Sequence, residues 1–298
     1  MLSIKTRLPD QPFIDAGETL RDEITRHAPE YQSVMSALHE DGYAVIDPAF
    51  DPDDLDTVEH FCKFEPTSEG RVQDAWKKQA AVGRLAVHAP VIEMLSTVYG
   101  RRAFPFQTLN FTYGTEQPAH SDAYHFHSKP GGFMCGVWVA LEDISPEAGP
   151  LMVYPGSHRL GFVNRWDLPG EQTYADYERH IADVIDAHEL DAKPALLKRG
   201  QALVWVANLL HGGAPRQEKS RTRLSQVSHY FFEDCAYVTP KAYDLERRKH
   251  LIRQPYDLTK RRHVLSQTKH LPQQMPLHYI LGLRLLLMLD NPPHFTRE

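Results

Sequence analysis

The stretch FQTLNFTYGTEQPAHSD, residues 106–122, joins a strand-like run to two side chains that commonly bind metals. Residues 106–113 are rich in aromatic and β-branched residues, as strands are, and a Gly/Pro-containing turn follows them. In an extended segment residues i and i+2 point to the same face, so His120 and Asp122 can present an imidazole and a carboxylate side by side while Ser121 turns away. The segment therefore offers two of the three ligands of a facial metal site.

A second histidine, His211, follows another apolar strand-like run in WVANLLHGGAP, residues 205–215. Two histidines and one carboxylate on one face of an octahedron leave coordination positions open, which suits non-haem iron(II) oxygenases. H-x-D alone is a weak signal, because a buried histidine bonded to an aspartate needs no metal. The order H-x-D, β-rich stretch, His and then Arg-x-Ser is much rarer, and it favours a metal site.

An arginine pair lies about a dozen residues after His211, where the strand-like run 222–233 begins. An arginine at this place can hold a carboxylate bidentately. Arg221 and Arg223 share one face of the expected strand, so alternation alone does not choose between them.

The composition is that of an ordinary soluble globular protein. The chain has 298 residues, of which 42% are hydrophobic and 24% charged, enough to bury a sizeable core. The formal net charge of -6 gives no support for a nucleic-acid partner. An odd number of cysteines without metal-type spacing (Cys62, Cys135 and Cys235) predicts free thiols in a reducing cytoplasm. We expect neither a secretory signal nor a transmembrane segment, because no stretch has the apolar length of either.

Helical patterns precede a β-rich region. We expect one helix over 18–38, another starting near Asp51 and a third from Pro90 to Gly100. Several short strands separated by Gly/Pro turns predict a mainly β protein with flanking helices, built as a sandwich or jelly roll. These strands are expected at 104–113, 132–143, 151–154, 200–210 and 222–233. We expect a single domain over 1–298, with its β core at 40–236.

Two segments fall outside the pattern of the β core. Residues 161–198 interrupt the strands with a helical pattern at 174–190, and such an insertion either faces the substrate as a lid or only covers a sheet. Residues 237–298 form a basic extension that we expect to be helical. Its Leu-rich part, 275–289, is short for a membrane span, so packing or a homodimer contact through this helix is the better interpretation.

Four stretches in one order give the chain a family likeness. They are GTEQPAHSDAYHF (114–126), GVWVALEDISPEAGPLMVYPGSHR (136–159), LLKRGQALVWVANLLHGGAP (196–215) and TRLSQVSHYFF (222–232). Together they resemble the phytanoyl-CoA dioxygenase family over about residues 40–236. The resemblance implies a double-stranded β-helix, which is a cupin-like jelly roll. It also implies a dioxygenase that uses iron(II), 2-oxoglutarate and O2 to hydroxylate a small molecule, with release of succinate and CO2.

The resemblance assigns the metal ligands. It implies that His120, Asp122 and His211 bind the iron. Related halogenases have a small residue in place of the carboxylate ligand, so Asp122 favours a hydroxylase. Gln201 stands where the family often has an aspartate, but that position holds no metal ligand.

Other positions are expected to bind the co-substrate or the substrate. For 2-oxoglutarate the first choices are Arg223 with Ser225, followed by Arg221 and Gln107. The candidates for substrate contact are Tyr124, His127, Lys129 and Trp138. Trp138 is equally well explained as a core residue. Hydroxyl, imidazole and ammonium groups together suit a small polar, anionic or natural-product-type substrate.

Two other classes of function stay open. His125 and His127 form an H-x-H that would suit a cupin-type metalloenzyme without 2-oxoglutarate, but the glutamate that this pattern needs does not follow. The Arg223/Ser225 pair also argues against it. The third class is a non-catalytic binding domain on the same fold, against which the complete His/Asp/His set argues. The sequence does not distinguish hydroxylation from desaturation, epoxidation or ring closure.

Overall fold

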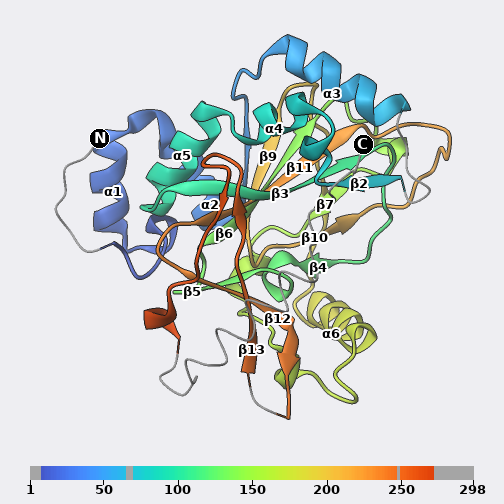
Figure 1. Cartoon of the computed structure of the whole chain (residues 1–298). Helices are drawn as coiled ribbons and strands as arrows, with labels where there is room; N and C mark the ends of the chain where they lie inside the picture. Colours follow the sequence, from blue (N-terminus) through green and yellow to red (C-terminus); the bar gives the residue numbers. More distant parts are fainter. Residues whose placement is uncertain (1–7, 65–69, 247–248, 272–298) are drawn as a thin grey trace, which may run out of the picture.

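Two antiparallel sheets form the centre of the computed structural model, which describes residues 8–64, 70–246 and 249–271 (Figure 1). The larger sheet has the strand order β1-β9-β6-β11-β3-β2, and the smaller one has the order β4-β10-β7-β8. The larger sheet consists of β1 (Tyr43–Ile46), β9 (Ala202–Val206), β6 (Met134–Ala140), β11 (Ser225–Phe232), β3 (Ala103–Phe111) and β2 (Arg71–Gln73). The smaller sheet consists of β4 (His120–Ser121), β10 (Leu210–Gly213), β7 (Leu151–Val153) and β8 (Lys193–Pro194). The predicted mainly β architecture is confirmed.

The two most apolar strands lie in the middle of the larger sheet. β6 reads MCGVWVA and β9 reads ALVWV, and all of their residues are buried. A near-continuous apolar run is expected where both faces of a strand are covered. β11, which pairs with β6 and β3, is also buried throughout but carries polar residues, including Ser225 and His229. These buried polar groups need partners inside the protein, and they lead to the functional site.

Six α-helices are described around the sheets. They are α1 (Glu18–His27), α2 (Gln32–Glu40), α3 (Pro52–Phe64), α4 (Ala80–Ala86), α5 (Ala89–Tyr99) and α6 (Tyr174–Ala187). In Figure 1, α1, α2 and α5 gather on the left and α6 lies at the lower right. The prediction of one helix over 18–38 is wrong, because the chain breaks between α1 and α2 at Ala28 and Pro29. Proline lacks the helical N–H and disfavours helix in the residue before it.

Short 3-10 helices connect many of these elements. They are η1 (Phe13–Asp15), η2 (Pro29–Tyr31), η3 (Ala75–Lys77), η4 (Asp122–Tyr124), η5 (Pro146–Ala148), η6 (Ser157–Arg159), η7 (Arg165–Asp167) and η8 (Thr268–His270). The cysteines Cys62, Cys135 and Cys235 are buried free thiols, as predicted. Within the described ranges, no helix has the length and apolarity needed to cross a membrane.

The expected helical extension after residue 236 is wrong for the part that the structure describes. That part forms β12 (Ala236–Asp244), β13 (Lys249–Arg253), β14 (Tyr256–Asp257) and β15 (Arg262–His263). β12 pairs with β13 on one side and with β5 (His127–Lys129) on the other. Long-range pairing with β5 supplies backbone partners that local composition does not reveal. The Leu-rich segment 275–289, and the homodimer contact predicted through it, lie outside the described residues.

Candidate metal centre

The smaller sheet places two histidines side by side. His120 lies in β4 and His211 in β10, and the register of this antiparallel pair sets them directly opposite each other. Opposite residues on two strands bring their side chains within contact distance. The sequence suggested that His211 stands at the end of one strand-like run, but it lies in the next strand, β10, after β9 has ended. The chain leaves β9 at Val206, turns through 207–209 and enters the second sheet.

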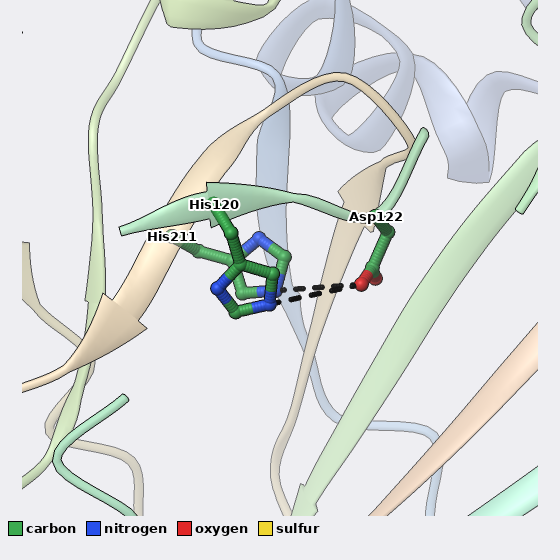
Figure 2. Close-up of side chains that lie close together, drawn as sticks. All are labelled: His120, Asp122 and His211. Carbon is green, nitrogen blue, oxygen red and sulfur yellow. Dashed lines mark ion pairs between the residues drawn. The ribbon is translucent and has the colours of Figure 1, made fainter. Parts of the chain in front are cut away.

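The two imidazoles converge on one carboxylate, as Figure 2 shows. Nε2 of His120 lies 4.0 Å from Oδ1 of Asp122, and Nε2 of His211 lies 3.8 Å from the same oxygen. Asp122 is the first residue of η4, directly after β4. One ligand atom from each residue lies within 4.8 Å of the others, and all three residues are buried. The predicted His/Asp/His set therefore meets at one point.

The backbone orients both histidines for metal binding. Nδ1 of His120 lies 3.0 Å from the carbonyl oxygen of Pro118, and Nδ1 of His211 lies 3.1 Å from that of Leu209. A carbonyl only accepts, so each Nδ1 carries the proton and each Nε2 presents its lone pair towards Asp122. Histidine ligands of metals are held in this way, by a hydrogen bond from the nitrogen that does not bind the metal.

Asp122 is held by one oxygen and presents the other. Its Oδ2 accepts a hydrogen bond of 2.9 Å from Nε1 of Trp205, and Nε2 of His229 lies 3.4 Å from the same oxygen. Burial opposes ionisation of this carboxyl, but the neighbouring histidines, His229 first, hold its pKa well below the usual range. Burial, and then the charge of His211, lowers the pKa of His120 to about 3. An ionised carboxylate beside neutral imidazoles is the donor set that a divalent metal ion requires.

A glycine makes room for the indole that holds Asp122. Gly136 lies opposite Trp205 in the β6–β9 pair. A Cβ atom on Gly136 would lie 2.2 Å from Cζ2 of Trp205. The first residue of the GVWV motif is therefore required by packing against Trp205.

Helix α6 of the predicted insertion is anchored on the metal-binding segment. The hydroxyl of the buried Tyr177 accepts a hydrogen bond of 2.8 Å from the backbone N–H of Ser121. Its ring stacks on Tyr124 with centroids 3.9 Å apart. The insertion thus supports the ligand segment directly, beyond covering a sheet face.

Arg223 is the arginine that the fold buries. It is 3% exposed, and its guanidinium lies 5.6 Å from the ring centroids of both Phe111 and Trp138. Nη1 donates to the Gly149 carbonyl at 3.4 Å, and Nε is buried without a hydrogen-bond partner among the described residues. Burial lowers the pKa of Arg223 to about 10, so it stays charged at neutral pH. An unmatched buried cation fits an incoming anion.

The alternative arginine lies at the surface. The side chain of Arg221 is 47% exposed, and its Nε donates to Glu218 at 2.8 Å. Ser225 lies on the same strand face as Arg223 and is buried, as the prediction requires. The geometry therefore favours Arg223 with Ser225 over Arg221.

Two predicted contact residues have a different environment from the one expected. Oε1 of Gln107 lies 3.1 Å from Nδ1 of His229, the residue that faces Asp122. Gln107 thus orients a neighbour of the carboxylate ligand. Trp138 is 1% exposed and lies beside Arg223. It forms a wall of the arginine pocket, and its predicted role in substrate binding is not supported.

The other three predicted substrate contacts lie in η4 and β5, close after Asp122 in the chain. Tyr124 is buried in its stack on Tyr177. In β5, Ser128 lies opposite Tyr237, whose ring packs 4.6 Å from Phe231 of the larger sheet. His127 and Lys129 alternate with Ser128 and so lie on the outer face. Contact of Tyr124, His127 and Lys129 with a substrate stays a prediction.

The ring of Phe162 covers His127 on this outer face of β5. The two rings are stacked, with centroids 4.3 Å apart.

Three other side chains surround the metal ligands. The amide nitrogen of Gln117 lies 3.4 Å from Nε2 of His120, and the ring of His125 lies 6.1 Å from the ring of His120. Nε2 of His125 lies 3.3 Å from the hydroxyl of Tyr174, which is 38% exposed. The sequence interpretation missed Gln117 and Tyr174 as site residues. For Gln117 a signal was present, because it precedes His120 by three residues on the same turn.

The fold and the buried His/Asp/His site define the class of jelly-roll proteins with a facial metal centre. The family model "Phytanoyl-CoA dioxygenase (PhyH)" matches residues 68–223, slightly more than half of the chain. The chain therefore belongs to the phytanoyl-CoA dioxygenase family, as the sequence resemblance predicted.

Curated relatives match part of the chain. Phytanoyl-CoA dioxygenase domain-containing protein 1 of Danio rerio is 34% identical over 105 residues, which are 34% of this chain and 34% of the relative. The peroxisomal phytanoyl-CoA dioxygenase of Homo sapiens is 28% identical over 134 residues, 44% of this chain and 38% of the relative. The matches thus span only about a third to two fifths of the relatives' own length.

Solved structures confirm the jelly-roll fold. The carbocyclase SnoK from nogalamycin biosynthesis has a TM-score of 0.58 at 16% identity, covering 85% of this chain and 98% of SnoK. EctD from S. alaskensis has a TM-score of 0.56 at 19% identity, covering 78% of this chain and 84% of EctD. At these identities the likeness establishes the fold.

Proposed function

We propose that the protein is an iron(II)- and 2-oxoglutarate-dependent dioxygenase that hydroxylates a C–H bond of a small molecule. The observation that carries the proposal is the convergence of Nε2 of His120, Nε2 of His211 and Oδ1 of Asp122 in a buried site. Membership of the phytanoyl-CoA dioxygenase family supports the same reaction class.

The residues of the site fit the cofactors that this reaction needs. His120, Asp122 and His211 would hold the iron through two neutral imidazoles and one carboxylate. When bound, iron(II), 2-oxoglutarate and O2 supply the oxidising chemistry, and 2-oxoglutarate leaves as succinate and CO2. The protein's contribution is to bind, orient and exclude water around these groups.

Arg223 would bind the distal carboxylate of 2-oxoglutarate. Its guanidinium offers a buried, unpaired Nε and a fork of donors, and this fork matches a carboxylate in a bidentate arrangement. The hydroxyl of Ser225 donates to the Arg223 carbonyl over 3.3 Å, and it would turn this donor towards the bound co-substrate. Phe111 and Trp138 flank the guanidinium and keep water from competing for it.

The reaction outcome is the finer part of the proposal. EctD was crystallised with 2-oxoglutarate and 5-hydroxyectoine, whereas SnoK is described as a carbocyclase and SnoN as an epimerase. The same fold therefore hosts different outcomes. We favour hydroxylation as the default outcome of this chemistry, and the carboxylate of Asp122 argues against halogenation. A product 16 mass units heavier than the substrate and carrying a new hydroxyl group would support hydroxylation, whereas an epoxide or a product of unchanged or lower mass would support another outcome.

Anaerobic titration with iron(II) and 2-oxoglutarate tests the cofactor chemistry. We expect a weak visible metal-to-ligand charge-transfer band that disappears in His211→Ala and weakens in Arg223→Ala. Iron binding without the band would favour the cupin-type metalloenzyme. No metal binding would favour the non-catalytic binding domain. Asp122→Gly should abolish hydroxylation, and undiminished hydroxylation in that variant would refute the ligand assignment.

A further inference from the structure

A second arginine lies close to the triad, on a strand that the sequence did not predict. Arg253 ends β13, and its guanidinium lies 4.7 Å from the ring centroid of Phe126. The ring of Phe126 lies 5.3 Å from that of His229, which in turn faces Asp122. One aromatic ring thus separates the Arg253 guanidinium from the residue that holds the carboxylate ligand.

The register of the three-stranded sheet explains this direction. β13 pairs with β12 so that Arg253 lies opposite Tyr237. Tyr237 packs against Phe231 of the larger sheet. Residues opposite each other share a face, so Arg253 points inward with Tyr237. Nη1 of Arg253 donates a hydrogen bond of 3.0 Å to Oγ1 of Thr239. Thr239 lies on the same strand as Tyr237.

Lys241 lies farther along β12, where the strand reaches the surface. It follows Thr239 by two residues, in the stretch where the β12–β13 register shifts. Burial, and then the charge of Arg253, lowers the pKa of Lys241. Burial, and then the charge of Lys241, lowers the pKa of His125 to about 4. The ring of His125 lies 6.2 Å from that of Phe126, which Arg253 contacts, and 6.1 Å from that of His120.

These cations have no acidic partner in the part of the chain that the structure describes. No carboxylate from 8–64, 70–246 or 249–271 lies within ion-pair distance of Arg253 or Lys241. Burial lowers the pKa of Arg253 to about 10, so it remains charged at neutral pH. Holding two cations together without an anion is unfavourable, and a bound anion would relieve the repulsion.

We propose that Arg253 and Lys241 bind an oxyanion of the substrate, a carboxylate or phosphoryl group, and so position its C–H bond at the metal. This inference rests on the proposed function and adds the chemical class of substrate to it. Arg253 supplies a fork of donors, Lys241 adds a point charge, and Phe126 lies against the guanidinium. The recognition element is the β12–β13 hairpin. Arg223, two residues before the start of β11, would bind the co-substrate instead.

The test compares three probes of similar shape. Benzoate carries a carboxylate, phenylphosphonate carries a phosphoryl oxyanion, and benzamide is neutral. Each is titrated calorimetrically into the anaerobic full-length protein loaded with iron(II) and the lowest saturating concentration of 2-oxoglutarate. We expect at least one oxyanion to bind and benzamide to bind at least 10-fold more weakly. The tighter oxyanion distinguishes a carboxylate from a phosphoryl substrate.

The variants are matched by charge and by sheet face. Arg253→Gln should weaken oxyanion binding roughly 10- to 100-fold, and Lys241→Gln by a smaller factor. Lys129→Gln removes the same charge from the outer face of the same sheet and should leave binding unchanged. Arg253→Lys keeps the charge but loses the fork, so its affinity should fall between wild type and Arg253→Gln. Lys241 is exposed, so Lys241→Gln still tests oxyanion binding if Arg253→Gln folds poorly.

The charge-transfer band of each loaded protein separates this inference from the proposed function. A band in wild type and in all variants, with oxyanion binding lost only in the Arg253 and Lys241 variants, would confirm the inference. It would be overturned by wild-type binding in Arg253→Gln, equal losses in Lys129→Gln and Lys241→Gln, equal affinity for benzamide, or no oxyanion binding to wild type. A missing band in wild type would instead refute the cofactor proposal.

Discussion

The indole N–H of Trp205 donates to Oδ2 of Asp122 over 2.9 Å, although 83 residues separate the two in the chain. Trp205 lies on the larger sheet, and Asp122 follows the first strand of the smaller one. The bond therefore crosses between the two sheets of the jelly roll. It occupies one carboxylate oxygen and leaves the other to face His120 and His211.

Removing this donor should weaken metal binding without unfolding the protein. In Trp205→Phe the ring remains, but Oδ2 loses its hydrogen bond and the carboxylate can rotate. We expect metal affinity to fall about 10- to 100-fold, as it does when such supporting partners are removed. Anaerobic iron(II) titration measures this. The control is Trp138→Phe, because Trp138 lies beside Arg223. This variant should leave metal affinity unchanged. Equal losses in both variants would contradict the specific role of Trp205.

Arg223 and Arg221 should differ sharply in their effect on 2-oxoglutarate binding. Arg223→Gln removes a buried charge that pairs with the co-substrate, and the expected loss is about 2–5 kcal/mol. Arg221→Gln removes an exposed ion pair with Glu218 and should change binding by less than about 0.5 kcal/mol. Titration of the charge-transfer band with 2-oxoglutarate measures both. Comparable losses of 2-oxoglutarate affinity in the two variants would contradict the assignment of this role to Arg223 alone.

Replacing Arg223 with an apolar residue should stabilise the protein when 2-oxoglutarate is absent. Arg223 is a buried cation with an unpartnered Nε, so its desolvation is uncompensated in the free protein. We expect Arg223→Met to melt at a higher temperature than wild type without 2-oxoglutarate. Because only wild type gains from ligand binding, saturating 2-oxoglutarate should reduce or reverse this difference. A lower melting temperature for Arg223→Met without ligand would show that the arginine is structural.

Tyr177 should contribute to stability and Tyr174 should not. Tyr177→Phe leaves the buried N–H of Ser121 without its acceptor, which costs about 1–3 kcal/mol. Tyr174→Phe removes an exposed hydroxyl that contacts His125 and should cost less than about 0.5 kcal/mol. Urea denaturation of the metal-free protein compares the two. Similar free energies of unfolding for wild type and Tyr177→Phe would rule out anchoring of α6 through this bond.

His127 should make the folded protein sensitive to acid. Burial, and then the charges of Lys129 and His250, lowers its pKa from 6.5 to about 3. The unfolded state therefore binds the proton more readily, so stability is complete above pH 6.5 and falls as the pH decreases towards 3. Melting temperatures at pH 7 and pH 4.5 should differ less in His127→Gln than in wild type. His188→Gln, on the exposed end of α6, is the control and should behave as wild type.

The amino-acid sequence by itself determined the class of fold and the candidate metal ligands. Apolar runs such as those of β6 and β9 predicted central strands, because burial on both faces leaves a local signature. The spacing of His120 and Asp122 predicted a shared face, because alternation is a property of the strand alone. The helix start at Pro52 and the helix end at Gly100 were predicted for the same reason, since caps are local.

Tertiary structure alone decided which polar groups are buried and which strands pair. Alternation left Arg221 and Arg223 equivalent, and only packing against Phe111 and Trp138 buried one of them. The hydrogen bond from Trp205 to Asp122 joins two sheets, so no sequence spacing predicts it. Local composition suggested a helix after residue 236, but pairing with β5 made β12 a strand. Periodicity encodes the face of an element, whereas its partner depends on contacts between residues far apart in the chain.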